Sequence, residues 1–313
     1  MTNHRSTTVR NWTVDQLPDL TGKTYFITGG NSGIGYESAV HLRRANADVI
    51  IGARSPEKGA AAVTSLMAVP GAGSVDLVRI DLADTASIRD ADRALREVTD
   101  GLDAVVNNAG VMQTPQEETA DRFEKQFGTN HLGHFLLNHL VFDLVARRSG
   151  RIVPVSSVAH RGAKGINFED PMLTNSYSPM AAYNQSKLAN ILYGFELARR
   201  LESAGSSVIA PTAHPGYSAT NLQSSGPTGP LKLLYKFTNA VMAQSAASGA
   251  VPVVLAAAGT EARNGAYYGP TRFGDTRGPV GESTIAGVAK DPVAGSRLWS
   301  LSEELLGITF TVT

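Results

Sequence analysis

Short apolar stretches alternate with longer amphipathic stretches through the first two thirds of the chain. The short stretches are rich in β-branched and aliphatic residues, which is typical of strands covered on both faces. In the longer stretches, such as 33–46 and 184–203, apolar residues recur with helical spacing, which predicts helices with one buried face. Strands are predicted at residues 23–28, 48–53, 74–80, 102–107, 151–156, 207–213 and 266–269.

Strands that alternate with helices predict an α/β fold, because each crossover helix returns the chain to a parallel neighbouring strand. We therefore expect a single Rossmann-fold domain over residues 21–313, with a doubly wound, mostly parallel seven-stranded sheet and helices on both faces. Residues 1–20 are expected to form an N-terminal extension, and residues from about 270 to 313 a C-terminal extension. In such a sheet, ligands bind beyond the carboxyl ends of the strands.

The composition favours a small-molecule partner. The 313 residues are 42% hydrophobic, and Lys plus Arg equals Asp plus Glu at 28 each, so no excess of positive charge would attract nucleic acid. Cysteine is absent, which excludes disulfides and thiolate nucleophiles. The N-terminal residues lack the apolar core of a secretory signal, and the apolar run at 250–259 is too short to span a bilayer. We expect a cytoplasmic protein with no membrane span and no metal site.

The sequence TGGNSGIG, residues 28–35, follows the first predicted strand and leads into a helix. Gly29 can form the tight turn, Gly33 can let the backbone approach a pyrophosphate, and Gly35 can let helix and strand pack closely. The helix N-terminus then faces the phosphates. An ordinary strand–helix turn would also explain the glycines, but their position favours a dinucleotide site.

The end of the second predicted strand indicates which dinucleotide is bound. An NAD site usually places an acidic residue there for the ribose 2′-hydroxyl, whereas this strand continues into Arg54. An arginine suits a 2′-phosphate, because its guanidinium donates two parallel charge-assisted hydrogen bonds. We therefore favour NADP over NAD; the alternative is that Arg54 is a solvated loop charge.

Two further strand ends carry candidate cofactor contacts. Asp81 and Leu82 follow the third strand, where the carboxylate can accept from the adenine amino group and the leucine can line the ring. The sequence NNAG, residues 107–110, follows the fourth strand, where Asn side chains can tie neighbouring strands together while Ala109 and Gly110 leave room for a ribose. Each feature alone is common in ordinary loops.

Tyr183 and Lys187 are four positions apart in a predicted helix, so both side chains lie on one face. Hydride transfer between a nicotinamide and a carbonyl leaves an oxygen that must gain or lose a proton. A nearby ammonium favours the phenolate form of a tyrosine. The pair can therefore serve as an acid–base centre if the fold brings the phenol beside the carbonyl.

With these features the sequence resembles the short-chain dehydrogenase/reductase family over about residues 20–260. The resemblance is closest to the retinol dehydrogenase-like and light-dependent protochlorophyllide reductase-like branches, judging by the LPDLTGKTYFITGGNSGIG opening and the long segment before Tyr183. The matching motifs, in the order of the family, are TGGNSGIG, DLAD, NNAG, NHLGHF, VSS, YNQSK and HPG.

The resemblance implies a catalytic set of Asn130, Ser157, Tyr183 and Lys187. Neighbouring residues of a strand point to opposite faces, so only one of Ser156 and Ser157 can face the site, and alignment on VSSVAH favours Ser157. Ser157 would donate a hydrogen bond to the substrate oxygen. Asn130 would hold a water that links Lys187 to solvent, and Lys187 would also bond the nicotinamide ribose.

After the sixth strand, HPGYSAT resembles the nicotinamide-binding turn of the family. Tyr217 departs from the usual Val or Ile, which suggests a substrate contact. The family also implies a substrate lid at about 218–245, although a plain packing helix would explain that segment equally well. The cofactor residues expected together are Gly29, Asn31, Ser32, Gly33, Ile34, Gly35, Arg54, Asp81, Leu82, Asn108, Ala109, Gly110, Tyr183, Lys187, Pro215, Gly216 and Thr220.

We therefore expect an NADP-dependent oxidoreductase that interconverts an alcohol and a carbonyl, with a lipophilic substrate suggested by the apolar lid. A non-catalytic NAD(P)-sensing protein on the same fold is the alternative from another class, but such relatives typically lose the tyrosine or the lysine. A protochlorophyllide-type double-bond reductase is a third reading, which Ser157 disfavours.

Three further features of the sequence do not change this prediction. The histidines 131, 134, 160 and 214 lack metal-ligand spacing, and the hydride mechanism needs no metal. Residues 295–308 form an amphipathic helix that can pack on its own domain or on a partner. Family members often associate through helices that flank the site, so a homodimer or homotetramer is compatible with the resemblance, unless the inserted segments block those faces.

Overall fold

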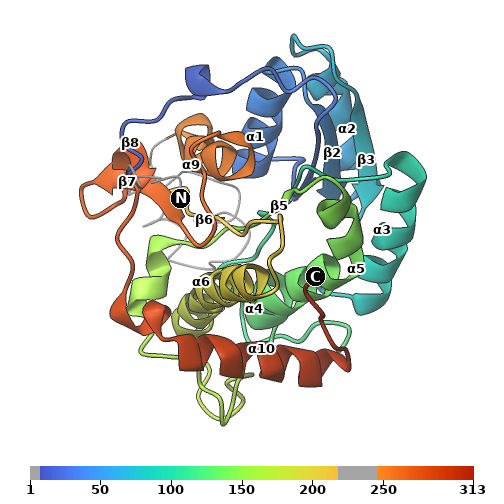
Figure 1. The fold of residues 1–313 in the computed structure, drawn as a ribbon. Coiled ribbons are helices and arrows are strands. Elements are labelled where there is room, and N and C mark those ends of the chain that lie inside the picture. Colours follow the sequence, from blue (N-terminus) through green and yellow to red (C-terminus); the bar gives the residue numbers. More distant parts are fainter. Residues whose placement is uncertain (1–7, 218–244) are drawn as a thin grey trace.

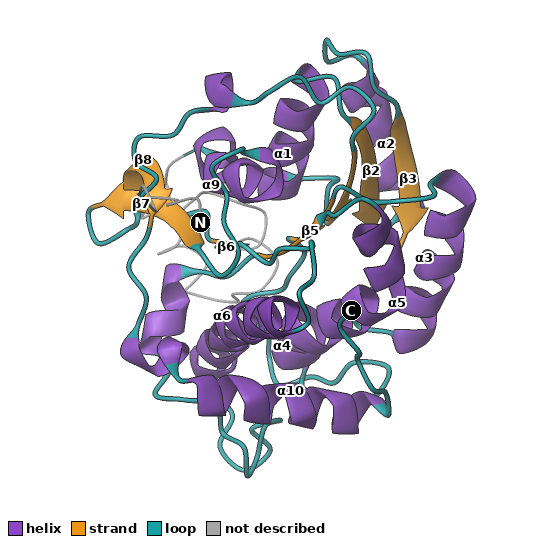
Figure 2. Ribbon diagram, viewed as in Figure 1, coloured by secondary structure: helices purple, strands orange, loops and turns teal. Residues whose placement is uncertain are grey.

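The computed structural model describes residues 8–217 and 245–313. Figures 1 and 2 show β2 and β3 between α1 on one side and α3 on the other, and the strands β7 and β8 at the left edge of the molecule. The strands are β1 (Thr24–Thr28), β2 (Asp48–Ala53), β3 (Val75–Arg79), β4 (Ala104–Asn107), β5 (Arg151–Pro154), β6 (Thr212–Ala213), β7 (Tyr267–Arg272) and β8 (Arg277–Glu282). The α-helices are α1 (Gly33–Arg44), α2 (Pro56–Met67), α3 (Thr85–Val98), α4 (Lys125–Phe127), α5 (Gly133–Arg147), α6 (Pro179–Ser203), α9 (Ala246–Ala258) and α10 (Pro292–Leu306). The short helices η1 (Val14–Gln16), η3 (Val158–Gly162) and η4 (Gly287–Lys290) are of the 3-10 type, and η2 (Gly128–Leu132) is a π-helical turn.

The central sheet has five parallel strands in the order β3-β2-β1-β4-β5. Side chains alternate between its faces, as the strand period requires. In β1, Tyr25 and Ile27 join one buried cluster while Phe26 joins the other. The predicted α/β fold with a parallel central sheet is confirmed.

Helices cover both faces of this sheet (Figure 1). One face packs against α1, α2 and α9, and Leu42, Leu66 and Val254 belong to the same cluster as Ile27. The other face packs against α3, α5 and α6, and Ile88, Phe135 and Leu197 belong to the cluster of Phe26. The site therefore rests on strands that are fixed from both sides.

The predicted single seven-stranded sheet differs from the observed one. A second sheet of three strands has the order β6-β7-β8, with β7 and β8 antiparallel. The strand predicted at 207–213 narrows to Thr212–Ala213, because Pro211 has no N–H to donate to a ladder. Isolated parallel bridges from Arg151 to Ile209 and from Val155 to Ala213 still connect the two sheets. The hairpin strand β8 was not predicted.

Helix α10 packs along α6, so in this structure the amphipathic C-terminal helix covers its own chain (Figure 1). Trp299 is only 1% exposed, and its ring lies 5.0 Å from that of Phe135 on α5 and 5.8 Å from that of Tyr193 on α6. Phe310 stacks on Trp299 at 5.0 Å. These aromatic contacts hold the back of the helix that carries Tyr183 and Lys187.

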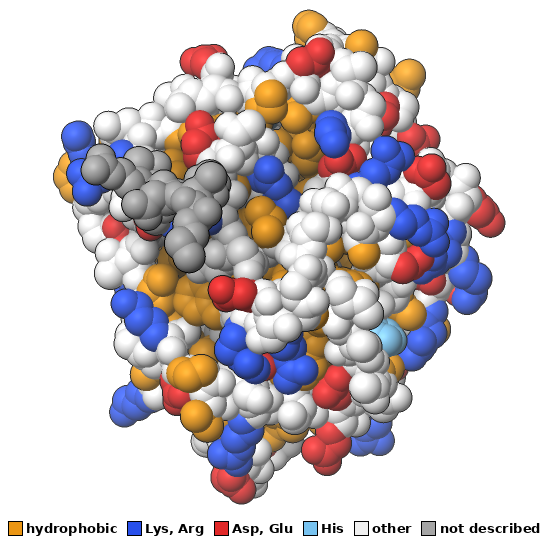
Figure 3. Space-filling view, in the orientation of Figure 1, with side chains coloured by type: hydrophobic (Ala, Val, Ile, Leu, Met, Phe, Trp, Pro, Cys, Tyr) orange, Lys and Arg blue, Asp and Glu red, His pale blue; other side chains and the backbone are white. Residues whose placement is uncertain are grey.

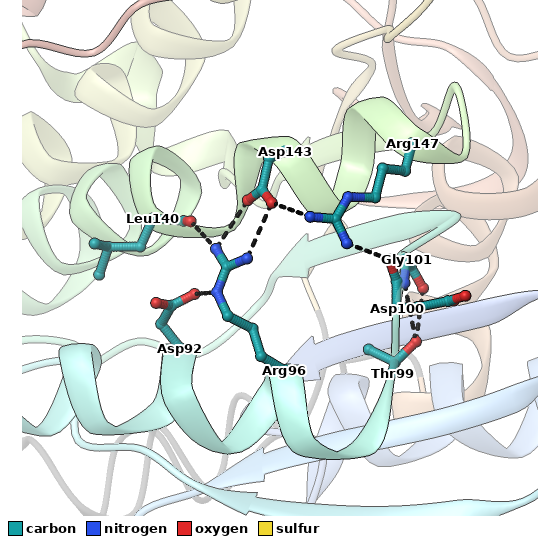
Figure 4. A network of polar contacts seen from close by, with 8 residues as sticks. All are labelled: Asp92, Arg96, Thr99, Asp100, Gly101, Leu140, Asp143 and Arg147. Carbon is teal, nitrogen blue, oxygen red and sulfur yellow. Dashed lines mark hydrogen bonds and ion pairs between the residues drawn. The ribbon is translucent and has the colours of Figure 1, made fainter.

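The outer surface of α3 and α5 carries a network of charged side chains (Figure 4). Arg96 on α3 donates to both carboxylate oxygens of Asp143 on α5 at 2.8 and 2.9 Å and to the carbonyl of Leu140 at 2.8 Å. Arg147 adds a contact to Asp143 at 2.8 Å. Acidic and basic side chains are also interspersed over the face in Figure 3, in keeping with the equal totals of 28.

Candidate active site

The glycine turn lies between β1 and α1. Gly29 and Gly33 adopt φ angles of +65° and +57°, which side chains disfavour. A Cβ on Gly35 would lie 2.5 Å from the carbonyl oxygen of Gly29, so helix and turn can approach this closely only without a side chain. The first turn of α1 has no acidic residue, and its N-cap Ser32 makes no side-chain capping bond. This helix end is suited to an anion such as a pyrophosphate.

Thr28 ties the end of β1 to the loop after β4. Its hydroxyl oxygen accepts from the backbone N–H groups of Asn108 and Ala109, each at 3.0 Å. The Asn108 side-chain amide donates to the Thr28 carbonyl at 2.9 Å. These bonds fix the NNAG loop beside the glycine turn.

His134 links this anchor to the predicted catalytic asparagine. Its Nδ1 lies 3.0 Å from the backbone carbonyl of Asn130, which can only accept, so Nδ1 carries the proton and donates. Its Nε2 then accepts from the Thr28 hydroxyl at 2.8 Å. Burial lowers the pKa of His134 to about 4, so the ring is neutral at pH 7.

Asn130 lies in the π-helical turn η2 and has no exposed surface. Its Oδ1 accepts from the backbone N–H of Val111 at 2.8 Å, and its amide donates to the Val111 carbonyl and to the Ser186 hydroxyl, both at 2.9 Å. Both amide hydrogens are therefore used within the protein. Of its two acceptors, the backbone carbonyl accepts from His134 and Oδ1 accepts from Val111.

Lys187 is 6% exposed and its ammonium donates to the Val155 carbonyl at 3.2 Å. The Lys187 nitrogen lies 5.8 Å from the centre of the Tyr183 ring, and Tyr183 is 9% exposed. Burial lowers the pKa of Lys187 to about 8. The side chains therefore lie together on α6, as their spacing predicts, and the ammonium is poorly solvated.

The two neighbouring serines point in different directions after β5. Ser156 is buried and its hydroxyl donates to the Lys187 carbonyl at 2.7 Å, so it fastens the strand to α6. Ser157 is partly exposed, caps η3, and accepts from the Ala159 N–H at 3.2 Å. The two side chains therefore diverge, as alternation predicts, and the choice of Ser157, which rests on the alignment on VSSVAH, stays a prediction.

The nicotinamide turn expected at Pro215 and Gly216 follows β6. Gly216 has a φ of +69°, and its N–H donates to Nδ1 of His214 at 3.2 Å. The other ring nitrogen of His214 then donates to the Ser283 hydroxyl at 2.7 Å. Thr220 and the expected lid at 218–245, apart from its last residue, lie outside the described residues.

The adenosine end is open to solvent. Arg54 is exposed directly after β2. Asp81 is partly exposed and accepts from the Ala83 N–H at 3.0 Å, while Leu82 is 6% exposed and packs against Gly133 of α5. Gly110 faces the catalytic end instead, since a Cβ there would lie 2.9 Å from Oδ1 of Asn130 and 3.7 Å from the Lys187 nitrogen. The remaining loop residues Asn31, Ser32 and Ile34 lie at the start of α1.

Several supporting residues were missed at the level of sequence. The sequence predicts no special role for the histidines of NHLGHF and HPG, yet His134 and His214 lie buried in contact with predicted site segments. Ser186 was not singled out either. Only the positions of these residues within the matched motifs could have indicated their roles. Among residues 8–217 and 245–313, no group of three or more metal-ligating side chains is present, and no helix is long and apolar enough to cross a membrane.

Comparisons with known proteins identify the family. The family model described as short chain dehydrogenase matches residues 23–229. Human retinol dehydrogenase 13 is 36% identical over 92% of this chain and 86% of its own length, and mouse retinol dehydrogenase 12 is 36% identical over 94% and 88%. A crystal structure of an uncharacterised protein from Mycobacterium paratuberculosis is 38% identical with a TM-score of 0.80, covering 96% of this chain and 100% of that one. The RhlG–NADP complex of Pseudomonas aeruginosa, at 24% identity and a TM-score of 0.63 over 80% of this chain and 94% of that one, shares the fold.

Proposed function

Because this chain belongs to the short-chain dehydrogenase family, in its retinol dehydrogenase-like branch, and is an oxidoreductase acting on CH–OH groups with NAD(P), we propose that it interconverts a lipophilic alcohol and its carbonyl with NADP. The observation that carries this proposal is the pairing of Tyr183 with the buried Lys187 on α6, which packs against η3, the short helix that Ser157 caps. A sensing protein without turnover would not need a lysine whose ammonium is buried away from water.

The cofactor would supply or accept the hydride at its nicotinamide. In our proposal, the phenol of Tyr183 gives a proton to the carbonyl oxygen in reduction and takes it back in oxidation. Lys187 favours the phenolate by its charge, and its burial strengthens that interaction. Ser157 donates to the same substrate oxygen and stabilises the charge that develops there.

Asn130 is proposed to keep this centre in place. Its side chain joins the loop after β4 to Ser186 on α6, only three positions from Tyr183. The Ser186 hydroxyl in turn donates to the Tyr183 carbonyl at 2.8 Å. A water on the Asn130 carbonyl would resupply the proton through Lys187.

The preference for NADP rests on Arg54. Arg54 is exposed directly after β2, where NAD sites usually carry an acidic residue. The N-cap Ser55, whose hydroxyl donates to Glu57 at 2.7 Å, and the exposed Lys58 follow; Glu57 offsets the charge of Lys58, so the proposal depends on the guanidinium of Arg54. The names of the retinol dehydrogenase relatives favour a long apolar alcohol or aldehyde as the substrate.

The test is a titration of the purified protein with NADPH and NADH followed by fluorescence, and then reduction of all-trans-retinal and nonanal. We expect tighter binding of NADPH and reduction of at least one aldehyde. Arg54→Asp should weaken the binding of NADPH relative to that of NADH. Arg122→Asp, a control at an exposed position shortly before α4, should leave the ratio of the two Kd values unchanged. Tyr183→Phe should abolish turnover and leave NADPH binding intact. Binding of neither cofactor would overturn the proposal.

We also propose that the chain does not self-associate through the outer face of α6, since α10 covers this face with Trp299. Light scattering of the purified protein tests this. A dimer that dissociates on substitution of exposed α6 residues would contradict it.

A further inference from the structure

The turn between β7 and β8, residues 273–276, lies against the loop that carries Ser157. Arg161 belongs to η3, the short helix that Ser157 caps. Its guanidinium donates to the Gly274 carbonyl at 2.9 Å and to the Thr284 carbonyl at 3.1 Å, and it forms an ion pair with Asp275. The C-terminal hairpin is thus fastened to the serine loop by one side chain.

Asp275 is built into this contact. It is 7% exposed although it lies in a hairpin turn, and its φ of +63° is one that few residue types tolerate. One carboxylate oxygen accepts from the Thr284 N–H at 2.9 Å and also meets Arg161. Burial opposes ionisation, but the hydrogen bonds from Thr284 and Arg161 outweigh it and hold the pKa of Asp275 below its usual value.

The same turn also reaches the expected nicotinamide turn. The Thr276 carbonyl accepts from the Tyr217 N–H at 2.8 Å, directly after Gly216. On the strands behind it, the His214 N–H donates to the Tyr268 carbonyl at 2.9 Å. One turn of the chain therefore contacts both the loop that carries Ser157 and the expected nicotinamide turn.

A second contact supports the serine loop from the same side. The buried His160 donates from Nδ1 to the Ser157 carbonyl at 2.7 Å and accepts at Nε2 from the Ala286 N–H at 3.3 Å. The ring of Tyr267 on β7 lies 5.8 Å from His160 and 4.9 Å from His214. The C-terminal segment is in this way packed between both loops rather than appended to them.

We propose that Asp275 and Arg161 are a positioning pair that holds the Ser157 loop and the nicotinamide turn at a fixed separation, so that the serine hydroxyl and the nicotinamide meet the same substrate carbon–oxygen bond. This inference rests on the proposed function. Both residues act at a distance: Arg161 through η3, which Ser157 caps, and Asp275 through Thr276, which accepts from the N–H of Tyr217.

The test compares Asp275→Asn with the unchanged protein. Asparagine keeps the shape and tolerates the left-handed backbone, but it removes the charge that Arg161 requires. We expect kcat for retinal or nonanal reduction to fall at least about 10-fold, because a small misplacement of reacting groups is enough for such a loss. The Kd for NADPH should change less than about threefold, since the residues proposed to hold its phosphates, the glycine turn and Arg54, belong to the β1–α1 and β2–α2 connections and not to the hairpin.

A readout independent of turnover is the fluorescence of bound NADPH, which reports how firmly the nicotinamide is held. We expect a smaller emission enhancement for Asp275→Asn at saturating protein. Arg161→Met should behave alike, and the double variant should lose no more than either single variant, because the two residues act as one unit. Additive losses in kcat would contradict a shared role.

The matched control is Glu282→Gln, which breaks the ion pair with Arg263 at the far end of β8. It loosens the same hairpin without touching the turn, so kcat and NADPH emission should stay near the original values. Equal losses in kcat for Glu282→Gln and Asp275→Asn would show that the loss comes from a less stable hairpin, and would overturn the positioning role. An Asp275→Asn variant with the kcat of the original protein would also overturn it. If the original protein neither binds NADPH nor reduces either aldehyde, the proposed function itself fails.

Discussion

Replacing Lys187 by methionine should make the protein inactive and more stable at neutral pH. Lys187 is 6% exposed, and burial lowers the pKa of its ammonium from 10.5 to about 8. Holding the charged form in the folded protein therefore costs about 3 kcal/mol at pH 7. Methionine fills a similar volume and removes this cost.

The hydrogen bond that is lost offsets only part of this gain. Lys187 donates to the Val155 carbonyl at 3.2 Å, but Asn190 donates to the same oxygen at 3.1 Å, so the carbonyl keeps a partner. The loss is then about 1 kcal/mol. We expect Lys187→Met to raise the free energy of unfolding by about 2 kcal/mol at pH 7.

The pH dependence identifies the cause. Because the folded-state pKa lies below the unfolded-state value, the original protein gains stability as the pH rises from 8 toward 10.5, where the unfolded chain binds more protons. The advantage of Lys187→Met should therefore shrink by about 2 kcal/mol between pH 8 and pH 9.5.

The assay is urea unfolding of both cofactor-free proteins from pH 6.5 to 9.5. Lys290→Met, a change at an exposed position of η4, should show no such pH-dependent difference. A Lys187→Met variant that is less stable at pH 7, or whose advantage does not change with pH, would refute the reasoning that the lysine is held charged against its burial.

Three further substitutions test individual contacts. Gly269→Ala should weaken NADPH binding in a fluorescence titration, because its Cβ would lie 1.9 Å from Nε2 of His214 and would displace the ring that holds Gly216; an unchanged Kd would show that this turn does not contact the cofactor. Trp299→Ala should lower the free energy of unfolding in urea by about 3–5 kcal/mol, and a loss below about 1 kcal/mol would mean that α10 is not firmly docked. His134→Phe should cost about 2–4 kcal/mol at pH 7.5 through two lost hydrogen bonds. The difference from the original protein should shrink as the pH falls from 6.5 toward 4, because the unfolded chain then binds a proton at His134 that the buried ring does not accept; thermal unfolding that shows a constant difference would contradict a neutral His134.

Much of the fold could be predicted because its strands are buried on both faces. The strand predicted at 48–53 matches β2 residue for residue, and those at 23–28 and 151–156 differ from β1 and β5 only at their ends. Apolar runs of this kind are read correctly since neither face offers a polar alternative. The hairpin strand β8 has the sequence RGPVGE, whose glycines and proline conceal a strand that is defined by pairing with β7.

Some contacts of the candidate site could also be predicted from the sequence, and others could not. Tyr183 and Lys187 could be placed together because their distance depends on a single helical turn. The partners of His134, by contrast, lie 106 positions away at Thr28 and one turn back at Asn130, and no local pattern specifies such a contact. Asp275 stands in an ordinary turn sequence, and only the tertiary structure brings it to Arg161.

The order in which the chain is synthesised has a consequence for when this site can first exist. Helix α6 bears Tyr183 and Lys187, but its back is covered by α10, and the Ser157 loop is braced by the hairpin β7–β8; both come far later in the chain. During translation the glycine turn and the central sheet can therefore form on the ribosome while the catalytic helix still exposes the surface that Trp299 will bury. Until α10 emerges, the nascent chain presents an apolar helix face of the kind that chaperones bind, and we expect the proposed catalytic centre to form only when synthesis has passed that helix.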